Sequence, residues 1–153
     1  MICIALYAPS SPQRLVDAAR AIFGSGIVDL LVVIKPVGMA AQVGLAEVSK
    51  VAYKRGKNLV ILSQLSEVRD VLNLNKVFIL VHDSDAKLLR EAVGAVNQGD
   101  RLCVVIQGSE VSIPKAELVQ AEPVRHSLPE IGVNPVADVA LVLYELRSLA
   151  PRT

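Results

Sequence analysis

Short, continuous apolar runs alternate with amphipathic stretches along the whole chain of 153 residues. An uninterrupted apolar run suits a strand that is covered on both faces, and such strands occur in parallel sheets flanked by helices. The pattern therefore predicts an α/β fold with a mainly parallel sheet and helices on both of its faces. The expected strands are Ile2–Tyr7, Asp29–Ile34, Asn58–Leu62, Lys76–Val81, Arg101–Gln107 and Pro123–His126.

Helices are expected where apolar residues recur at helical spacing. The first presents such a face between a Ser11 N-cap and Gly24, and this face comprises Leu15, Ala18, Ala19, Ile22 and Phe23. The last helix, from Pro135 to about Leu149, is apolar on nearly all sides, so it must be buried or pack on another subunit. The remaining helices are expected at about 41–55, 66–72 and 85–97, the last of these capped by Ser84 or Asp85.

The composition limits both the core and the possible partners. Hydrophobic residues make up 52% of the chain and aromatic residues only 3%, so the core must consist of Val, Leu, Ile and Ala. A net charge of +1 gives no broad attraction to nucleic acid, so an RNA site would have to be a local patch. The densest basic cluster is either an RNA-backbone contact or a solvated face, and it comprises Lys50, Lys54, Arg55 and Lys57.

The chain carries no sign of a membrane or secreted protein. No apolar run approaches the roughly 20 residues that span a bilayer, and Met1-Ile2-Cys3-Ile4 lacks a basic leader. We therefore expect a cytoplasmic protein with no membrane partner. Cys3 and Cys103 both fall in expected strands, where buried thiols acting as small hydrophobes are expected instead of a disulfide or metal pair.

Two motifs follow one another in the last third of the chain. The expected strand 101–107 ends in Gly108-Ser109-Glu110, and Gly132-Val133-Asn134 later opens an apolar helix that reaches Leu143-Tyr144-Glu145. This order resembles the SpoU branch of the SPOUT methyltransferases, in which Gly-Ser-Glu follows a hydrophobic strand and Ser-Leu-Asn-Val-Ser precedes a helix ending in Leu-Tyr-Glu. With Asn134 set on the family's Asn, Leu143-Tyr144-Glu145 falls on Leu-Tyr-Glu without a gap.

The resemblance implies a fold, a cofactor and a reaction. It implies one SPOUT-like α/β domain over residues 1–153, with a C-terminal trefoil knot at about 101–149 that binds S-adenosylmethionine. It also implies methylation of an RNA substrate (tRNA or rRNA) at the ribose 2′-hydroxyl. The enzyme would be a homodimer that meets through the first and last helices and needs no metal. The implied cofactor-binding residues are Ile106, Gln107, Gly108, Ser109, Glu110, Leu128, Ile131, Gly132, Val133 and Asn134.

Two residues are catalytic candidates by the same resemblance. The family carries an Arg on its first helix, and alignment on Gly24 places Ala18 at that position. Arg14 lies one turn earlier on the same helical row, so it either orients the target ribose or is a solvated charge. Asn134 is the second candidate, although Asn before Pro is also a good helix N-cap. Val136 stands where the family has a second Ser, which counts against catalysis.

Three other functions stay open. The altered first motif favours a SpoU-like dimer that binds cofactor or RNA but has lost catalysis. A metal-dependent nuclease of the RecB type needs clustered carboxylates, and Asp83 with Asp85 is the nearest approach. A nucleotide-binding domain has little support, because no Gly-x-Gly-x-x-Gly follows the first strand. His126 is a candidate base because histidine is the side chain suited to proton transfer near neutral pH, but a lone His at a strand end is expected to be a structural or surface residue.

Overall fold

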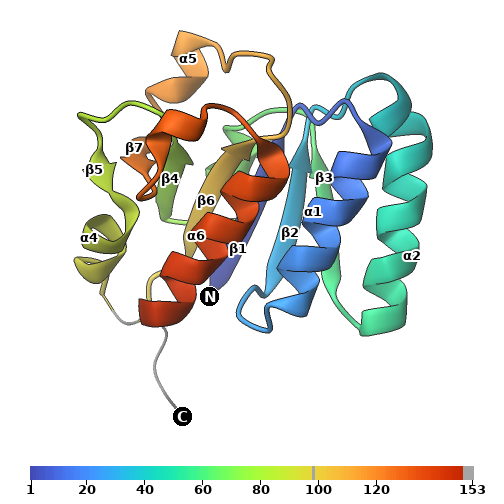
Figure 1. The fold of residues 1–153 in the computed structure, drawn as a ribbon. Helices are drawn as coiled ribbons and strands as arrows, with labels where there is room; N and C mark the ends of the chain where they lie inside the picture. Colours follow the sequence, from blue (N-terminus) through green and yellow to red (C-terminus); the bar gives the residue numbers. More distant parts are fainter. Residues whose placement is uncertain (98, 150–153) are drawn as a thin grey trace.

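The computed structural model describes residues 1–97 and 99–149, and within them seven strands form one sheet (Figure 1). The strand order is β3-β2-β1-β6-β4-β7-β5, and every pairing is parallel. The prediction of a parallel α/β fold is thus confirmed. The strands are β1 (Ile2–Tyr7), β2 (Leu30–Ile34), β3 (Asn58–Leu62), β4 (Lys76–Leu80), β5 (Lys87–Leu88), β6 (Leu102–Gln107) and β7 (Glu122–Arg125).

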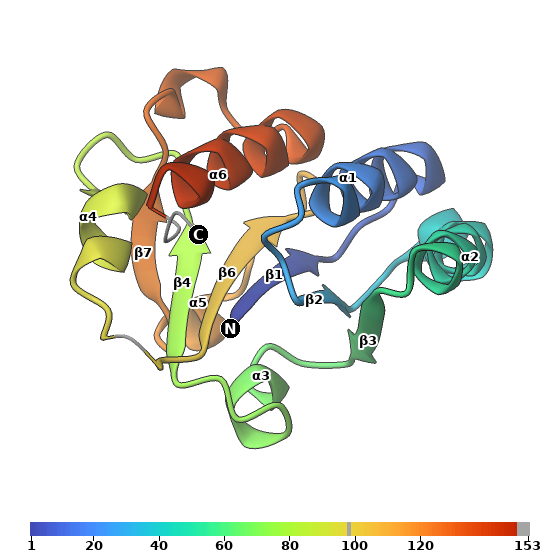
Figure 2. The same cartoon turned by 90° about the horizontal axis from the view of Figure 1, so that it is seen from below.

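Helices cover both faces of this sheet, as predicted. Viewed from below, α1, α2 and α6 form a layer on one face, and α3 lies on the other (Figure 2). The helices are α1 (Pro12–Gly24), α2 (Leu45–Arg55), α3 (Glu67–Asp70), α4 (Leu89–Gly94), α5 (Lys115–Leu118) and α6 (Pro135–Leu149), with a π-helical turn η1 (Ala40–Gly44) and a 3-10 turn η2 (Pro129–Ile131).

The strand residues divide between two hydrophobic clusters because successive side chains point to opposite faces. Ile4 and Leu6 belong to the cluster beneath α1 and α6, whereas Cys3, Ala5 and Tyr7 belong to the cluster on the other face. Cys3 and Cys103 are register partners in β1 and β6, and both are buried free thiols. The prediction that they pack as small hydrophobes is confirmed.

Local signals account for some of the helix ends. The Ser11 hydroxyl accepts a hydrogen bond from the Arg14 amide at 3.3 Å, which caps α1 as expected. The prediction for 85–97 was wrong at both ends, because Lys87–Leu88 pair with β7 as an edge strand and α4 runs only from Leu89 to Gly94. The Asp83 carboxylate accepts from the Asp85 amide at 2.9 Å, so these residues form a turn and do not cap α4.

Helix α6 buries most of its apolar surface inside the chain. It packs against α1, α4 and β6, and Val139, Val142 and Leu146 are buried there. Tyr144 is 75% exposed on the outward face of the helix. Burial within its own chain therefore explains most of the apolar residues of α6. The homodimer stays a prediction.

Strand β7 lies between β4 and β5, although both of these strands precede it in the sequence. The connection at residues 81–86 must therefore pass the carboxyl end of β7, where the chain leaves for α6. Such a crossing is what a C-terminal knot requires; the threading itself stays a prediction. Among the described residues, no helix is long and apolar enough to cross a membrane.

Candidate functional site

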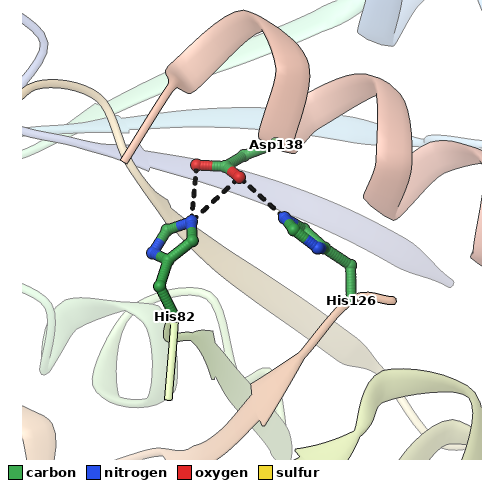
Figure 3. A group of neighbouring side chains, drawn as sticks. All are labelled: His82, His126 and Asp138. Carbon is green, nitrogen blue, oxygen red and sulfur yellow. Dashed lines mark hydrogen bonds and ion pairs between the residues drawn. The ribbon is translucent and has the colours of Figure 1, made fainter. Parts of the chain in front are cut away.

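Three chain segments meet at one carboxylate where the chain passes the end of β7 (Figure 3). Asp138, in the first turn of α6, accepts hydrogen bonds from His82 Nε2 at 3.0 and 3.1 Å and from His126 Nε2 at 2.8 Å. His82 follows β4 and His126 follows β7, so the cluster ties together segments that are 56 and 12 residues from Asp138. Asp138 and His126 are fully buried, and we call these three residues the Asp138 cluster.

The ring nitrogens of His126 have fixed roles. The Leu128 amide donates a hydrogen bond to His126 Nδ1 at 3.0 Å, so Nδ1 carries no proton and Nε2–H is the donor to Asp138. A metal ion on Nε2 would require a protonated Nδ1 that faces an acceptor. In the described parts of the chain, this cluster is the one group of three His, Cys, Asp or Glu residues that could share an ion. Its hydrogen bonds fit a structural centre better than a metal site.

The same carboxylate holds both ends of the loop at residues 128–134. At one end it fixes His126, which receives the Leu128 amide. At the other end its Oδ2 accepts the Asn134 amide at 3.1 Å. Asn134 Oδ1 in turn accepts the Ala137 amide at 3.2 Å, so the predicted N-cap of the last helix is confirmed. Gly132, within this loop, has a φ of 69°, a conformation that favours glycine.

A second carboxylate of α6 fixes the residue just before this loop. Glu145 Oε1 accepts from the amide and the hydroxyl of Ser127, at 3.1 and 2.8 Å. Glu145 is 4% exposed, and its Oε2 has no hydrogen-bond partner among the described residues. The Arg90 guanidinium lies 3.8 Å from Oε1 and offsets the buried charge.

Gly108 is required by a close approach of the chain to itself. A Cβ atom at this position would lie 2.9 Å from the Pro9 backbone and from the Tyr7 carbonyl oxygen. The Gly108 amide donates to that carbonyl at 2.7 Å. The missing side chain therefore makes room for the loop that follows β1. The cofactor-binding role implied for Gly108 stays a prediction.

This approach brings two of the predicted site segments together. A hollow of about 470 Å³ is lined by Ser10 and Arg14 on one side and by Ser109, Glu110 and Val111 on the other. Arg14, the catalytic candidate, thus faces the Gly-Ser-Glu segment. A smaller hollow of about 180 Å³ lies between the carboxyl ends of β4 and β6; its lining includes Leu80, Gln107 and Ile113.

The remaining predicted cofactor residues lie at the carboxyl end of β6 and on the loop at residues 128–134. The Ile106 side chain is fully buried in the core, so this residue could meet a ligand only through its backbone. Leu128 and Ile131 are exposed apolar side chains, at 49% and 43%, and Val133 is half-buried beside them. They lie on the loop that the Asp138 cluster holds.

A polar group at the ends of β1 and β2 was not expected from any sequence pattern. The Tyr7 hydroxyl donates to the Glu117 carboxylate of α5, and Lys35 Nζ lies 2.8 Å from Glu117 Oε1 and 3.2 Å from the Tyr7 oxygen. Burial, followed by the bond to Glu117, raises the pKa of Tyr7, and the Glu117 bond raises the pKa of Lys35. For Glu117, burial works to raise the pKa, but the bonds from Lys35 and Tyr7 prevail and lower it.

Comparison with known protein families gives a nuclease description. Residues 38–145 match the family model described as "RecB-family nuclease (DUF2122)". A relative in Aeropyrum pernix, named "Putative type II restriction enzyme", is 38% identical over 92% of this chain and 89% of its own length. A relative in Methanocaldococcus jannaschii, also named "Putative type II restriction enzyme", is 29% identical over 94% of both chains.

Solved structures with the same fold carry other names. The "Probable Methyltransferase" of Bordetella pertussis superposes with a TM-score of 0.76 and 20% identity, over 96% of this chain and 94% of that one. An "AdoMet bound rRNA methyltransferase" of Sinorhizobium meliloti superposes with a TM-score of 0.71 and 11% identity, over 99% of this chain and 57% of that one. At these identities the likeness shows the fold alone, and it agrees with the predicted SPOUT-like α/β fold.

We predict that Asp138→Ala lowers the free energy of unfolding by about 3 to 5 kcal/mol, because it leaves buried partners of a carboxylate unpaired. Urea unfolding would measure the loss. Asp138→Asn, which keeps one acceptor oxygen, should lose less. Asp70→Ala removes an exposed carboxylate and should stay within about 0.5 kcal/mol of the wild type. Equal stability of Asp138→Ala and Asp70→Ala would contradict the role given to the cluster.

We also predict an acid-sensitive contribution from Glu117. Its pKa is lowered in the folded chain from an ordinary value of 4.5, so its stabilising effect is present above that pH and is lost as the pH falls below it. Glu117→Gln should therefore be less stable than the wild type at neutral pH. Urea unfolding at pH 7 and at pH 3.5 should show the difference shrinking in acid; a difference independent of pH would refute the assignment.

Proposed function

This chain belongs to the DUF2122 family, and we propose that it is an S-adenosylmethionine-dependent RNA methyltransferase despite the nuclease description that the family carries. The observation that carries the proposal is the hollow shared by Arg14 and the Ser109–Glu110 segment. It lies at the carboxyl ends of parallel strands, where ligands bind in open α/β sheets. The fold likeness to methyltransferases, one of them described as AdoMet-bound, supports the same assignment.

The cofactor would lie between the two loops that carry the predicted binding residues. Backbone groups of residues 106–110 would form one wall, and the apolar side chains of Leu128 and Ile131 would cover the other side. Leu128 and Asn134 are both held through Asp138, so the loop at 128–134 is ordered before any ligand arrives. Such preorganisation lowers the entropy cost of binding.

Arg14 would position the RNA. When bound, S-adenosylmethionine supplies a methyl group on a positively charged sulfur. Arg14 projects from α1 into the shared hollow, where its guanidinium can hold a phosphate and orient the ribose 2′-hydroxyl toward that methyl group. Correct positioning of the two reacting groups would supply much of the rate.

A homodimer is part of this proposal. The outward face of α6 carries Tyr144, which is 75% exposed, next to the exposed Ala140, and α1 lies beside it. Two copies that meet through these faces would cover the exposed ring. In such a dimer, the Arg14 that serves one cofactor site would come from the same chain or from the second copy.

A nuclease is the second candidate, because the relatives' names favour it. Its chemistry requires several carboxylates that share a metal ion. The one candidate ion group that the described residues 1–97 and 99–149 contain has a single carboxylate, Asp138, and two histidines. Asp83 and Asp85 are exposed, and the Asp83 carboxylate is bonded to the Asp85 backbone in a turn. The site chemistry therefore favours methyl transfer.

We predict that the protein binds S-adenosylmethionine in calorimetry and transfers radiolabelled methyl groups to bulk tRNA or rRNA. Arg14→Ala should lower kcat by about 100-fold with little change in cofactor affinity, because it acts on the position of the RNA. Lys76→Ala removes an exposed cation from the amino end of β4 and should leave both quantities unchanged.

Other outcomes select the alternatives. Cofactor binding with no methyl transfer to any RNA would identify a module that has lost catalysis. Magnesium-dependent DNA cleavage that Asp83→Ala abolishes, in a protein that does not bind the cofactor, would establish the nuclease.

A further inference from the structure

An exposed aromatic ring stands among lysines on the outer side of α2. Lys50, Tyr53 and Lys54 lie at i, i+3 and i+4, which places them on one helical row, while Val48 and Ala52 are buried on the opposite side. Tyr53 is 89% exposed. A ring so exposed contributes little to the core of its own chain, and such a residue in a basic environment is typical of nucleic-acid surfaces.

A hollow of about 660 Å³ adjoins this ring. It lies between α2, the edge strand β3 and the amino ends of β1 and β2, and both Tyr53 and Lys57 line it. Leu59 and Val60 give it an apolar wall. The hollow is large enough for a flat ring system to enter beside Tyr53, since ligand pockets range from about 300 to 1,000 Å³.

Lysines outnumber carboxylates around the hollow. Lys50 pairs with Glu47 at 3.4 Å, and the Asp29 carboxylate, which keeps its charge, accepts the Ile2 amide at 2.8 Å. Within the described part of the chain, Lys54 and Lys57 form no ion pair. Both lysines follow Tyr53 within four residues of the sequence, and they provide a local positive charge in a chain whose net charge is only +1.

We propose that Tyr53, Lys54 and Lys57, here called the Tyr53 surface, dock a single-stranded segment of the RNA substrate. A base stacks on the Tyr53 ring and the neighbouring phosphates contact the two lysines, which is how single-stranded nucleic acid is bound without a sequence code. The inference rests on the proposed function and deepens it. It gives the RNA a second contact at the amino end of the sheet, whereas the Arg14 hollow lies at the carboxyl end. The six residues of β1 span about 20 Å between these two ends.

The test measures the anisotropy of a fluorescein-labelled, mixed-sequence RNA oligonucleotide and, separately, the KM for bulk tRNA or rRNA. Tyr53→Ala should weaken oligonucleotide binding by about 5- to 100-fold, and Tyr53→Phe should restore it, because stacking needs only the ring. A double variant, Lys54→Ala and Lys57→Ala, should bind RNA with a weaker salt dependence. The slope of the logarithm of the binding constant against the logarithm of the salt concentration should become shallower by about 0.7 for each phosphate that a lysine no longer neutralises. KM should rise in these variants, while kcat and calorimetric affinity for S-adenosylmethionine stay unchanged.

Lys76→Ala is the control for loss of a single exposed cation. Wild-type RNA affinity and KM in Tyr53→Ala and in the double lysine variant, in a protein that does transfer methyl groups, would overturn the Tyr53 surface and leave the proposed function intact. A wild type that binds neither the cofactor nor RNA would remove both. Concentration-dependent self-association that Tyr53→Ala abolishes, with unchanged RNA affinity, would assign the surface to a second copy and overturn the RNA inference.

Discussion

A single buried carboxylate, Asp138, fixes the arrangement of the segments around the candidate site. A charged group without exposure is costly unless it is hydrogen-bonded. The Asp138 carboxylate accepts hydrogen bonds from His82, His126 and the Asn134 amide at 2.8 to 3.1 Å. It also lies in the first turn of α6, where the helix dipole favours negative charge. These hydrogen bonds make the carboxylate stable inside the protein, and in return they hold the loop at 128–134 at both ends.

The apolar runs were sufficient to predict the main strands. Ile2–Tyr7 and Asn58–Leu62 were predicted with the bounds that the structure has, and the other four main strands differ by a residue at one or both ends. Strand β5 has only two residues, and α5 buries none of its side chains, so neither element shows a recurring apolar pattern in the sequence. Because α5 was not predicted, Glu117 was not recognised as part of the polar group.

The Asp138 cluster was missed for a different reason. His82 and Asp138 are 56 residues apart, and no local pattern indicates that they meet. One signal was present: Asp138 is an acidic residue in a helix that is otherwise apolar on nearly all sides, and a buried charge there requires partners. His126, expected from the sequence to be a structural or surface residue, is one of these partners and is fully buried. Arg14 and Ser109 were predicted separately, and the structure brings them to one hollow because Gly108 allows the loop after β1 to approach β6.

The family description names a nuclease, whereas we propose methyl transfer. In this proposal the cofactor contacts residues 106–110 and 128–134, so these two segments test it. Amide hydrogen exchange, followed by mass spectrometry with and without saturating S-adenosylmethionine, tests this most directly. A cofactor held between the two loops slows exchange in both, and leaves the amino ends of the strands unaffected. Unchanged exchange in both loops at saturating cofactor would contradict the assignment of this chain as a methyltransferase.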